Sequence, residues 1–174
     1  PVPDDPTRPH TALVLLDCQK AFLNGDWAEY FGGHAQVGPI QGAFERTLAL
    51  LDAPWKLSGC VMLCTRCYTD GEEAEYIDSL APFLREVPWV WKPTMDITQN
   101  ARFHTWMKAQ LSAGVKTFVI GGCTTTSCVR VSSQAVRKAY PDPSVRVVVD
   151  LSLCGARTEN YEPNAESDPV LVRI

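Results

Sequence analysis

The stretch Val119-Ile-Gly-Gly-Cys-Thr-Thr-Thr-Ser-Cys-Val-Arg130 decides the fold prediction for this 174-residue chain. An apolar run typical of a buried strand leads into small and hydroxyl-bearing residues, and Cys128 then opens a predicted helix. A thiol at a helix N-terminus sits at the positive end of the macrodipole, and unpaired N–H groups there can bind an oxyanion. Cys128 is therefore a candidate nucleophile, although the same pattern also fits a small buried hydrophobic residue.

Two further apolar runs end in charged residues. One, over residues 11–17, ends in Asp17, and the other, over residues 89–92, ends in Lys92. Functional groups gather at the carboxyl ends of parallel strands, so Asp17 can serve as a general base. Lys92 can hold that carboxylate ionised and lower the thiol pKa. The alternatives are a turn aspartate bonded to nearby backbone and a solvated surface lysine.

Strands and helices alternate along the chain. The predicted strands cover residues 11–17, 59–65, 88–92, 116–121 and 145–150. The predicted helices cover residues 40–53, 72–84, 101–112 and 125–139, with an aromatic, glycine-rich loop over 24–38. This order predicts one domain over residues 1–174, a three-layer α/β/α Rossmann-like fold with a mostly parallel central sheet of about six strands. The tail over residues 160–174 fits either an arm or a final strand.

Composition narrows the class of partner. Hydrophobic residues make up 45% of the chain and charged residues 21%, which are ordinary globular values. The net charge of −4 and the lack of a basic stripe argue against nucleic acid. No apolar run approaches the roughly 18 residues of a membrane span. We expect a small-molecule substrate, no membrane and a cytoplasmic location.

Seven cysteines form an odd set in a chain long enough to fold without disulfides, which favours reduced thiols. Cys64-x-x-Cys67 can mean half a zinc site or a redox pair. A zinc site needs a second ligand pair, which the other cysteines and the scattered histidines do not supply. We therefore expect no metal, and a metal-binding Cys-x-x-Cys module stays open as an alternative.

Three motifs together resemble the isochorismatase-like hydrolases, a superfamily that includes nicotinamidases, carbamoylsarcosine amidases and ureidoacrylate hydrolases. The resemblance spans roughly residues 11–157. The matching motifs are Leu-Leu-Asp17-x-Gln19-x-x-Phe22, the strand-borne Lys92, and Gly122-x-x-Thr125-x-x-Cys128-Val129.

The resemblance implies a cysteine-dependent hydrolase of C–N bonds in amides, carbamoyl or ureido compounds, without a cofactor. Asp17 would take the proton of Cys128, Lys92 would keep the pair charged, and the thiolate would form a thioester. The backbone N–H groups of Thr124 and Cys128 would form the oxyanion hole, beside a cis peptide between Cys123 and Thr124. The family usually assembles as homodimers or homotetramers.

The resemblance also bears on the substrate. Nicotinamidases carry an Asp-x-His motif where this chain has Thr65-Arg-Cys67, and isochorismatases proper lack the nucleophilic cysteine. A metal-free amide or ureide hydrolase is therefore favoured over nicotinamidase activity, isochorismatase activity or an inactive binding protein. The expected substrate-binding residues are Gln19, Phe22, Trp27 and Arg66, and Tyr30 would also line the pocket. A surface salt bridge fits the arginine equally well, and core or lid packing fits the others. Residues 93–100 form an unusually long loop that can make a rim over the substrate.

Overall fold

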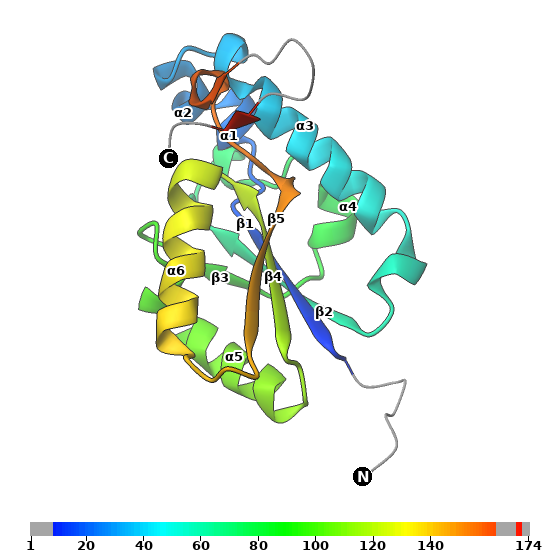
Figure 1. The fold of residues 1–174 in the computed structure, drawn as a ribbon. Helices are drawn as coiled ribbons and strands as arrows, with labels where there is room; N and C mark the ends of the chain where they lie inside the picture. Colours follow the sequence, from blue (N-terminus) through cyan, green and yellow to red (C-terminus); the bar gives the residue numbers. More distant parts are fainter. Residues whose placement is uncertain (1–8, 163–169, 172–174) are drawn as a thin grey trace.

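The computed structural model describes residues 9–162 and 170–171, and its centre is a five-stranded parallel sheet (Figure 1). The strand order is β3-β2-β1-β4-β5. These strands are β1 (Thr11–Leu16), β2 (Cys60–Arg66), β3 (Trp89–Trp91), β4 (Thr117–Cys123) and β5 (Arg146–Gly155). The predicted α/β/α fold is confirmed, with five central strands rather than about six. In the tail, β7 (Val170–Leu171) pairs with β6 (Tyr161–Glu162), and the rest of 163–174 lies outside the described residues.

Strand β1 is the middle of the sheet because its residues are apolar on both faces. Residues 12–16 are all at most 3% exposed, as expected of a parallel strand covered by helices on both sides. Its neighbours are β2 and β4, both parallel to it. The carboxyl ends of β1, β2 and β4 therefore meet at one edge of the sheet.

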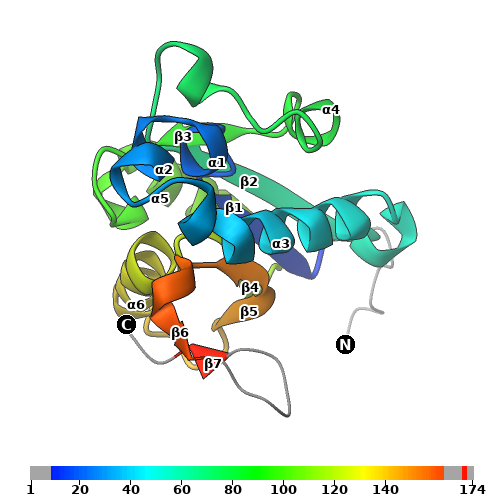
Figure 2. The ribbon, with the colours of Figure 1, turned by 90° about the horizontal axis from the view of Figure 1, so that it is seen from above.

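Helices cover both faces of the sheet, as Figure 2 shows from above. One apolar core lies on the side of α3 and α4, and a second lies on the side of α5 and α6. The α-helices are α1 (Ala21–Asn24), α2 (Asp26–Tyr30), α3 (His34–Leu51), α4 (Ala81–Leu84), α5 (Ala101–Ser112) and α6 (Arg130–Ala139). Shorter turns are η1 (Pro54–Leu57), η2 (Glu72–Ala74), η3 (Ile97–Gln99), η4 (Thr125–Val129) and η5 (Thr158–Asn160). No helix in the described residues is long and apolar enough to span a membrane.

Two predicted segments differ from the structure. The region 72–84 contains only η2 and α4, because the backbone between them bonds to residues 18–20 instead of forming a helix: Lys20 N–H donates to the Glu75 carbonyl, and Ile77 N–H donates to the Cys18 carbonyl. The region 24–38 is helical rather than a loop, because α2 buries Ala28 and α3 begins at His34.

Gly122 permits β1 and β4 to meet closely beneath the strand ends. Its φ is +108°, in the region that favours glycine, and an added Cβ would overlap the carbonyl oxygen and amide nitrogen of Leu16. The register of β4 with β5 shifts at the same place, between Ile120 and Gly122. A glycine is therefore required by both conformation and contact.

We expect Gly122→Ala to destabilise the protein more than Gly114→Ala. Gly114 has a similar φ of +100°, but its added Cβ would meet nothing within 4 Å. The control should lose about 1–2 kcal/mol from the left-handed backbone alone. Gly122→Ala should lose about 1–3 kcal/mol more, because the Leu16 backbone must move. Urea unfolding of the two variants measures the difference, and equal losses would contradict the contact argument.

Candidate active site

The structure brings Asp17, Lys92 and Cys128 together at the carboxyl edge of the sheet. Asp17 directly follows β1, Lys92 directly follows β3, and Cys128 lies in the η4 turn between β4 and α6. The Lys92 ammonium lies 2.8 Å from Asp17 Oδ2 and donates a 3.2 Å hydrogen bond to Cys128 Sγ. Residues that are distant in sequence thus form one charged, hydrogen-bonded group.

Asp17 is fully buried and held in one orientation. The Thr65 hydroxyl donates to Asp17 Oδ1 at 2.5 Å and accepts from the Asp17 N–H at 3.1 Å. Oδ2 has the Lys92 ammonium as its ionic partner and accepts no other hydrogen bond from the described residues. Asp17 also has a φ of +53°, which is uncommon for a residue other than glycine and concentrates at functional sites.

Lys92 is 1% exposed and is fixed by the loop that follows it. Its ammonium donates a third bond, 2.9 Å long, to the Thr94 carbonyl. The loop itself is anchored to α6, because the Ser132 hydroxyl donates to the Met95 carbonyl at 2.7 Å and accepts from the Ile97 N–H at 3.2 Å. The long 93–100 loop therefore holds the lysine, and its role as a rim over the substrate stays a prediction.

The charges in this group determine how the thiol ionises. Burial opposes the charge on Lys92, but Asp17 and Cys128 outweigh it, and the net effect raises the lysine pKa above its usual value. Burial and the Asp17 carboxylate raise the pKa of Cys128, and Lys92 offsets this only in part. Lys92 lowers the thiol pKa, as expected, but the net shift is upward because desolvation and Asp17 together are larger.

The predicted oxyanion-hole residues lie on the turn that carries the thiol. A cis peptide joins Cys123 and Thr124, as the resemblance implied. The Thr124 and Ser127 hydroxyls are hydrogen-bonded to each other at 2.5 Å, and the Cys123 thiol donates to the Asp17 carbonyl at 3.1 Å. The turn is thus tied to the end of β1, while the oxyanion role of Thr124 and Cys128 stays a prediction.

Gln19 uses its side-chain amide to organise backbone. Its Nε2 donates to the carbonyls of Tyr68 and Ala74, and its Oε1 accepts from the N–H groups of Cys67 and Tyr68. The side chain is fully buried. These bonds fit a residue that shapes the loop after β2 better than one that contacts substrate.

The other predicted substrate-binding residues lie in two separate surroundings, an aromatic cluster around Phe22 and a stack of rings around Arg66. Phe22 is buried and lies against Trp27, with ring centroids 4.9 Å apart, whereas Tyr30 is 82% exposed. The guanidinium of Arg66 is stacked between Tyr76 and Trp89, 4.2 Å and 4.7 Å from their ring centroids. The Arg66 carbonyl accepts from the Lys92 N–H at 2.8 Å. No hydrogen bond or ion pair in the described residues joins the Arg66 guanidinium to the Asp17–Lys92–Cys128 group, and its substrate role stays a prediction.

The Cys64-x-x-Cys67 motif is divided between two environments. Cys64 is buried, and that burial raises its pKa to about 12, whereas the Cys67 thiol lies 3.5 Å from Gln19 Oε1. All seven cysteines are free thiols. Within residues 9–162 and 170–171, no group of three or more His, Cys, Asp or Glu side chains could hold a metal ion.

The sequence reasoning missed Thr65 and Ser132 as parts of the site. Both are fully buried polar residues that orient a predicted catalytic residue or its loop. Thr65 stands out in sequence as a hydroxyl at the end of an apolar strand, and Ser132 lies one helical turn after Cys128. Neither signal alone distinguishes them from other hydroxyl residues.

The fold and this group of residues define a layered α/β protein with a buried acid, a buried lysine and a cysteine at the carboxyl edge of its sheet. An isochorismatase domain model matches residues 11–166, and the chain belongs to the isochorismatase family of hydrolases. No curated protein sequence matches significantly.

Several solved structures share the fold. N-carbamoylsarcosine amidase from Thermoplasma acidophilum is 16% identical with a TM-score of 0.66, covering 88% of this chain and 87% of its own. An isochorismatase from Pseudomonas putida KT2440 is 20% identical with a TM-score of 0.64, covering 97% and 81%. A nicotinamidase from Staphylococcus aureus is 12% identical with a TM-score of 0.63, covering 85% of each chain.

We expect opposite shifts of the Cys128 pKa in two variants. Asp17 raises the thiol pKa and Lys92 lowers it, so Asp17→Asn should lower the pKa and Lys92→Met should raise it. Iodoacetamide alkylation from neutral to alkaline pH, with each cysteine followed by peptide mass spectrometry, measures these shifts. In the unmodified protein the Cys128 pKa should lie above the ~8.5 of a free thiol.

Cys60 is the internal control for this measurement. Its pKa is raised by burial and lowered by a backbone bond to Leu13, with no contribution from Asp17 or Lys92, so its profile should be the same in both variants. A Cys128 pKa below that of a free thiol in the unmodified protein, or a rise in Asp17→Asn, would contradict the electrostatic description.

Proposed function

We propose that this chain is a cysteine-dependent hydrolase that cleaves the C–N bond of an amide, carbamoyl or ureido group in a small molecule. The observation that carries the proposal is the Lys92 ammonium between Asp17 Oδ2 and Cys128 Sγ, at 2.8 Å and 3.2 Å. One cation in this position stabilises negative charge on either partner, as a proton moves between them. Similar structures are named for N-carbamoylsarcosine and nicotinamide as substrates, which supports the bond type.

The proposed reaction has two halves that use the same side chains. Cys128 Sγ attacks the carbonyl carbon while Asp17 takes the thiol proton, and the carbonyl oxygen becomes an oxyanion facing the N–H groups of Thr124 and Cys128. The C–N bond then breaks, Asp17 returns the proton to the nitrogen, and ammonia or an amine leaves a thioester. Asp17 next takes a proton from water, whose oxygen displaces the thiolate, and the thiolate recovers that proton. Every proton in these steps passes through Asp17.

The elevated thiol pKa makes Asp17 essential as a base. Because burial and Asp17 raise the pKa of Cys128, the thiol carries its proton at neutral pH before substrate binds. A preformed thiolate would need no base, whereas this thiol needs one within reach during attack. The free thiols are also compatible with the predicted cytoplasmic location, because that compartment is reducing.

We expect Cys128→Ala to abolish ammonia release from whichever compound the unmodified protein hydrolyses. A panel of N-carbamoyl amino acids, ureido acids and primary amides identifies that substrate by coupled ammonia detection. The variant should lose at least about 1000-fold in kcat, as is common when a covalent nucleophile is removed. Cys60→Ala is the matched control, because Cys60 lies at the other end of β2, and it should keep the rate of the unmodified protein.

The covalent intermediate provides a second test. Acid quenching during turnover should trap an acyl group on Cys128, located by intact mass and peptide mapping. Activity that survives Cys128→Ala would overturn the proposal, and survival with a vinyl ether such as isochorismate would assign isochorismatase chemistry instead.

A further inference from the structure

Strand β5 forms one outer edge of the central sheet. It pairs with β4 on one side, and no strand in the described residues pairs with its other side (Figure 1). The first half of β5 is unusually apolar for an open edge, because three consecutive valines lie between Arg146 and Asp150. Residues 147–150 are only half-buried, and Leu151 is 63% exposed. Open edges of this kind are templates for pairing with another strand.

The register with β4 determines which backbone groups face outward. The Arg146 N–H donates to the Lys116 carbonyl at 2.7 Å, and Val147, Val148 and Val149 stand opposite Phe118, Val119 and Ile120. Because alternate residues of a strand bond to opposite neighbours, residues 146 and 148 bond toward β4. The N–H and C=O groups of Val147 and Val149 therefore point to the open edge.

The sequence of this edge is complementary to itself when it runs antiparallel. With Val148 opposite Val148 of a second copy, Val147 stands opposite Val149, and Arg146 stands opposite Asp150. The outward-facing groups of Val147 and Val149 then form hydrogen-bonded pairs, which is the pattern that antiparallel strands require. A two-fold axis beside Val148 makes the Arg146–Asp150 and Val147–Val149 contacts twice each.

The charges at the two ends of this segment have no ionic partners within residues 9–162 and 170–171. Arg146 is exposed, and Asp150 uses Oδ1 to accept from the N–H and hydroxyl of Ser152. Oδ2 of Asp150 is thus available to an arginine on the opposite strand. We propose that β5 of one protomer pairs antiparallel with β5 of a second copy of this chain through residues 146–150, forming a continuous ten-stranded sheet across a two-fold dimer.

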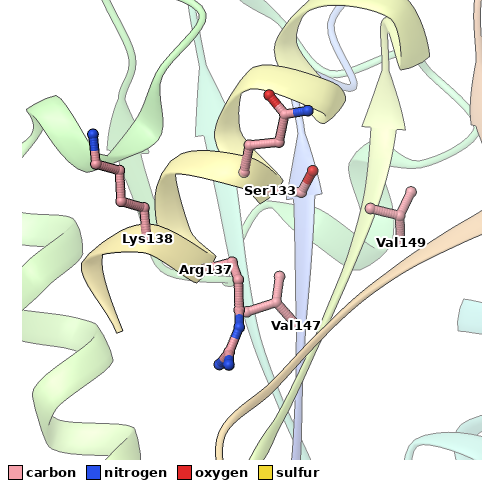
Figure 3. Close-up of a pocket in the computed structure, with 6 residues that line it drawn as sticks. Ser133, Arg137, Lys138, Val147 and Val149 are labelled. Atoms are coloured by element: carbon pink, nitrogen blue, oxygen red, sulfur yellow. The ribbon is translucent and has the colours of Figure 1, made fainter. Parts of the chain in front are cut away.

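A groove beside this edge would be closed by the same pairing. It lies between α6 and β5 and is lined by Ser133, Gln134, Arg137, Lys138, Val147 and Val149 (Figure 3). Directly opposed residues of paired strands project to the same face of the sheet. Val147 and Val149 of both copies would therefore form one apolar floor between the two α6 helices, which removes their exposed surface from water.

The structure also limits how far the pairing extends. Beyond Asp150 the strand departs from its regular register with β4, and the Arg46 guanidinium donates to the Ser152 carbonyl at 2.5 Å, so that carbonyl is already occupied. The pairing segment is therefore bounded at residue 150. A one-residue slip would place the valine backbone groups out of phase and separate Arg146 from Asp150, so the register is determined.

Charge reversal tests the proposed arrangement. Sedimentation velocity over a range of concentrations should show the unmodified chain as a dimer that weakens with added salt. Arg146→Asp and Asp150→Arg should each raise the dimer dissociation constant by about 10-fold or more, because each creates two like-charge pairs. An equimolar mixture of the two variants should form a heterodimer, and the double variant Arg146→Asp/Asp150→Arg should recover the original association.

A cross-linking measurement covers the case in which a charge variant fails to fold. Val148→Cys should form a disulfide with its counterpart under mild oxidation, because the two Cβ atoms of such a pair lie about 4.5–5.5 Å apart. Val147→Cys is the control, since its counterpart stands two residues away on the opposite strand. Peptide mass spectrometry separates these bonds from those of native cysteines. A monomer at all concentrations, a dimer insensitive to Arg146→Asp, or equal cross-linking of the two cysteine variants would overturn the proposal.

Discussion

The buried ion pair between Asp17 and Lys92 is the constraint on which the rest of the site depends. Neither side chain is more than 1% exposed, and removing one partner from a buried pair typically costs about 3–5 kcal/mol because the other charge is left uncompensated. The pair also joins the ends of β1 and β3, which are separated in the sheet by β2. Thr65 on that intervening strand completes the connection by holding the other carboxylate oxygen.

The same pair explains why the thiol is not a simple reactive cysteine. A lysine beside a lone thiol would lower its pKa, but here the positive charge is already matched by Asp17 at 2.8 Å. Burial and the Asp17 carboxylate raise the thiol pKa more than Lys92 lowers it, so the net shift favours the protonated thiol. The proposed mechanism moves this proton from the thiol to the leaving group.

Sequence reasoning succeeded where a residue's position in the fold follows from its place at the end of a strand. Asp17, Lys92 and Cys128 each follow an apolar run, and parallel strands must bring such ends together. It failed where tertiary contacts compete with local preference. The acidic stretch at 72–84 contains helix-forming residues, yet its backbone bonds to residues 18–20. The substrate contact predicted for Gln19 stays a prediction, and its hydrogen bonds to the backbone of Cys67, Tyr68 and Ala74 follow only from the fold.

The candidate catalytic groups and the proposed dimer contact lie on different strands of the sheet. The candidate catalytic groups follow β1, β3 and β4, whereas β5 supplies none of them. The two sheet edges also differ. At the β3 edge, the Asn100 side chain occupies the Trp91 carbonyl and the strand is only three residues long, so little backbone is open to a partner. The β5 edge presents a longer segment bounded by opposite charges. The proposed pairing through β5 therefore leaves the buried ion pair in place, since Asp17 and Lys92 follow β1 and β3.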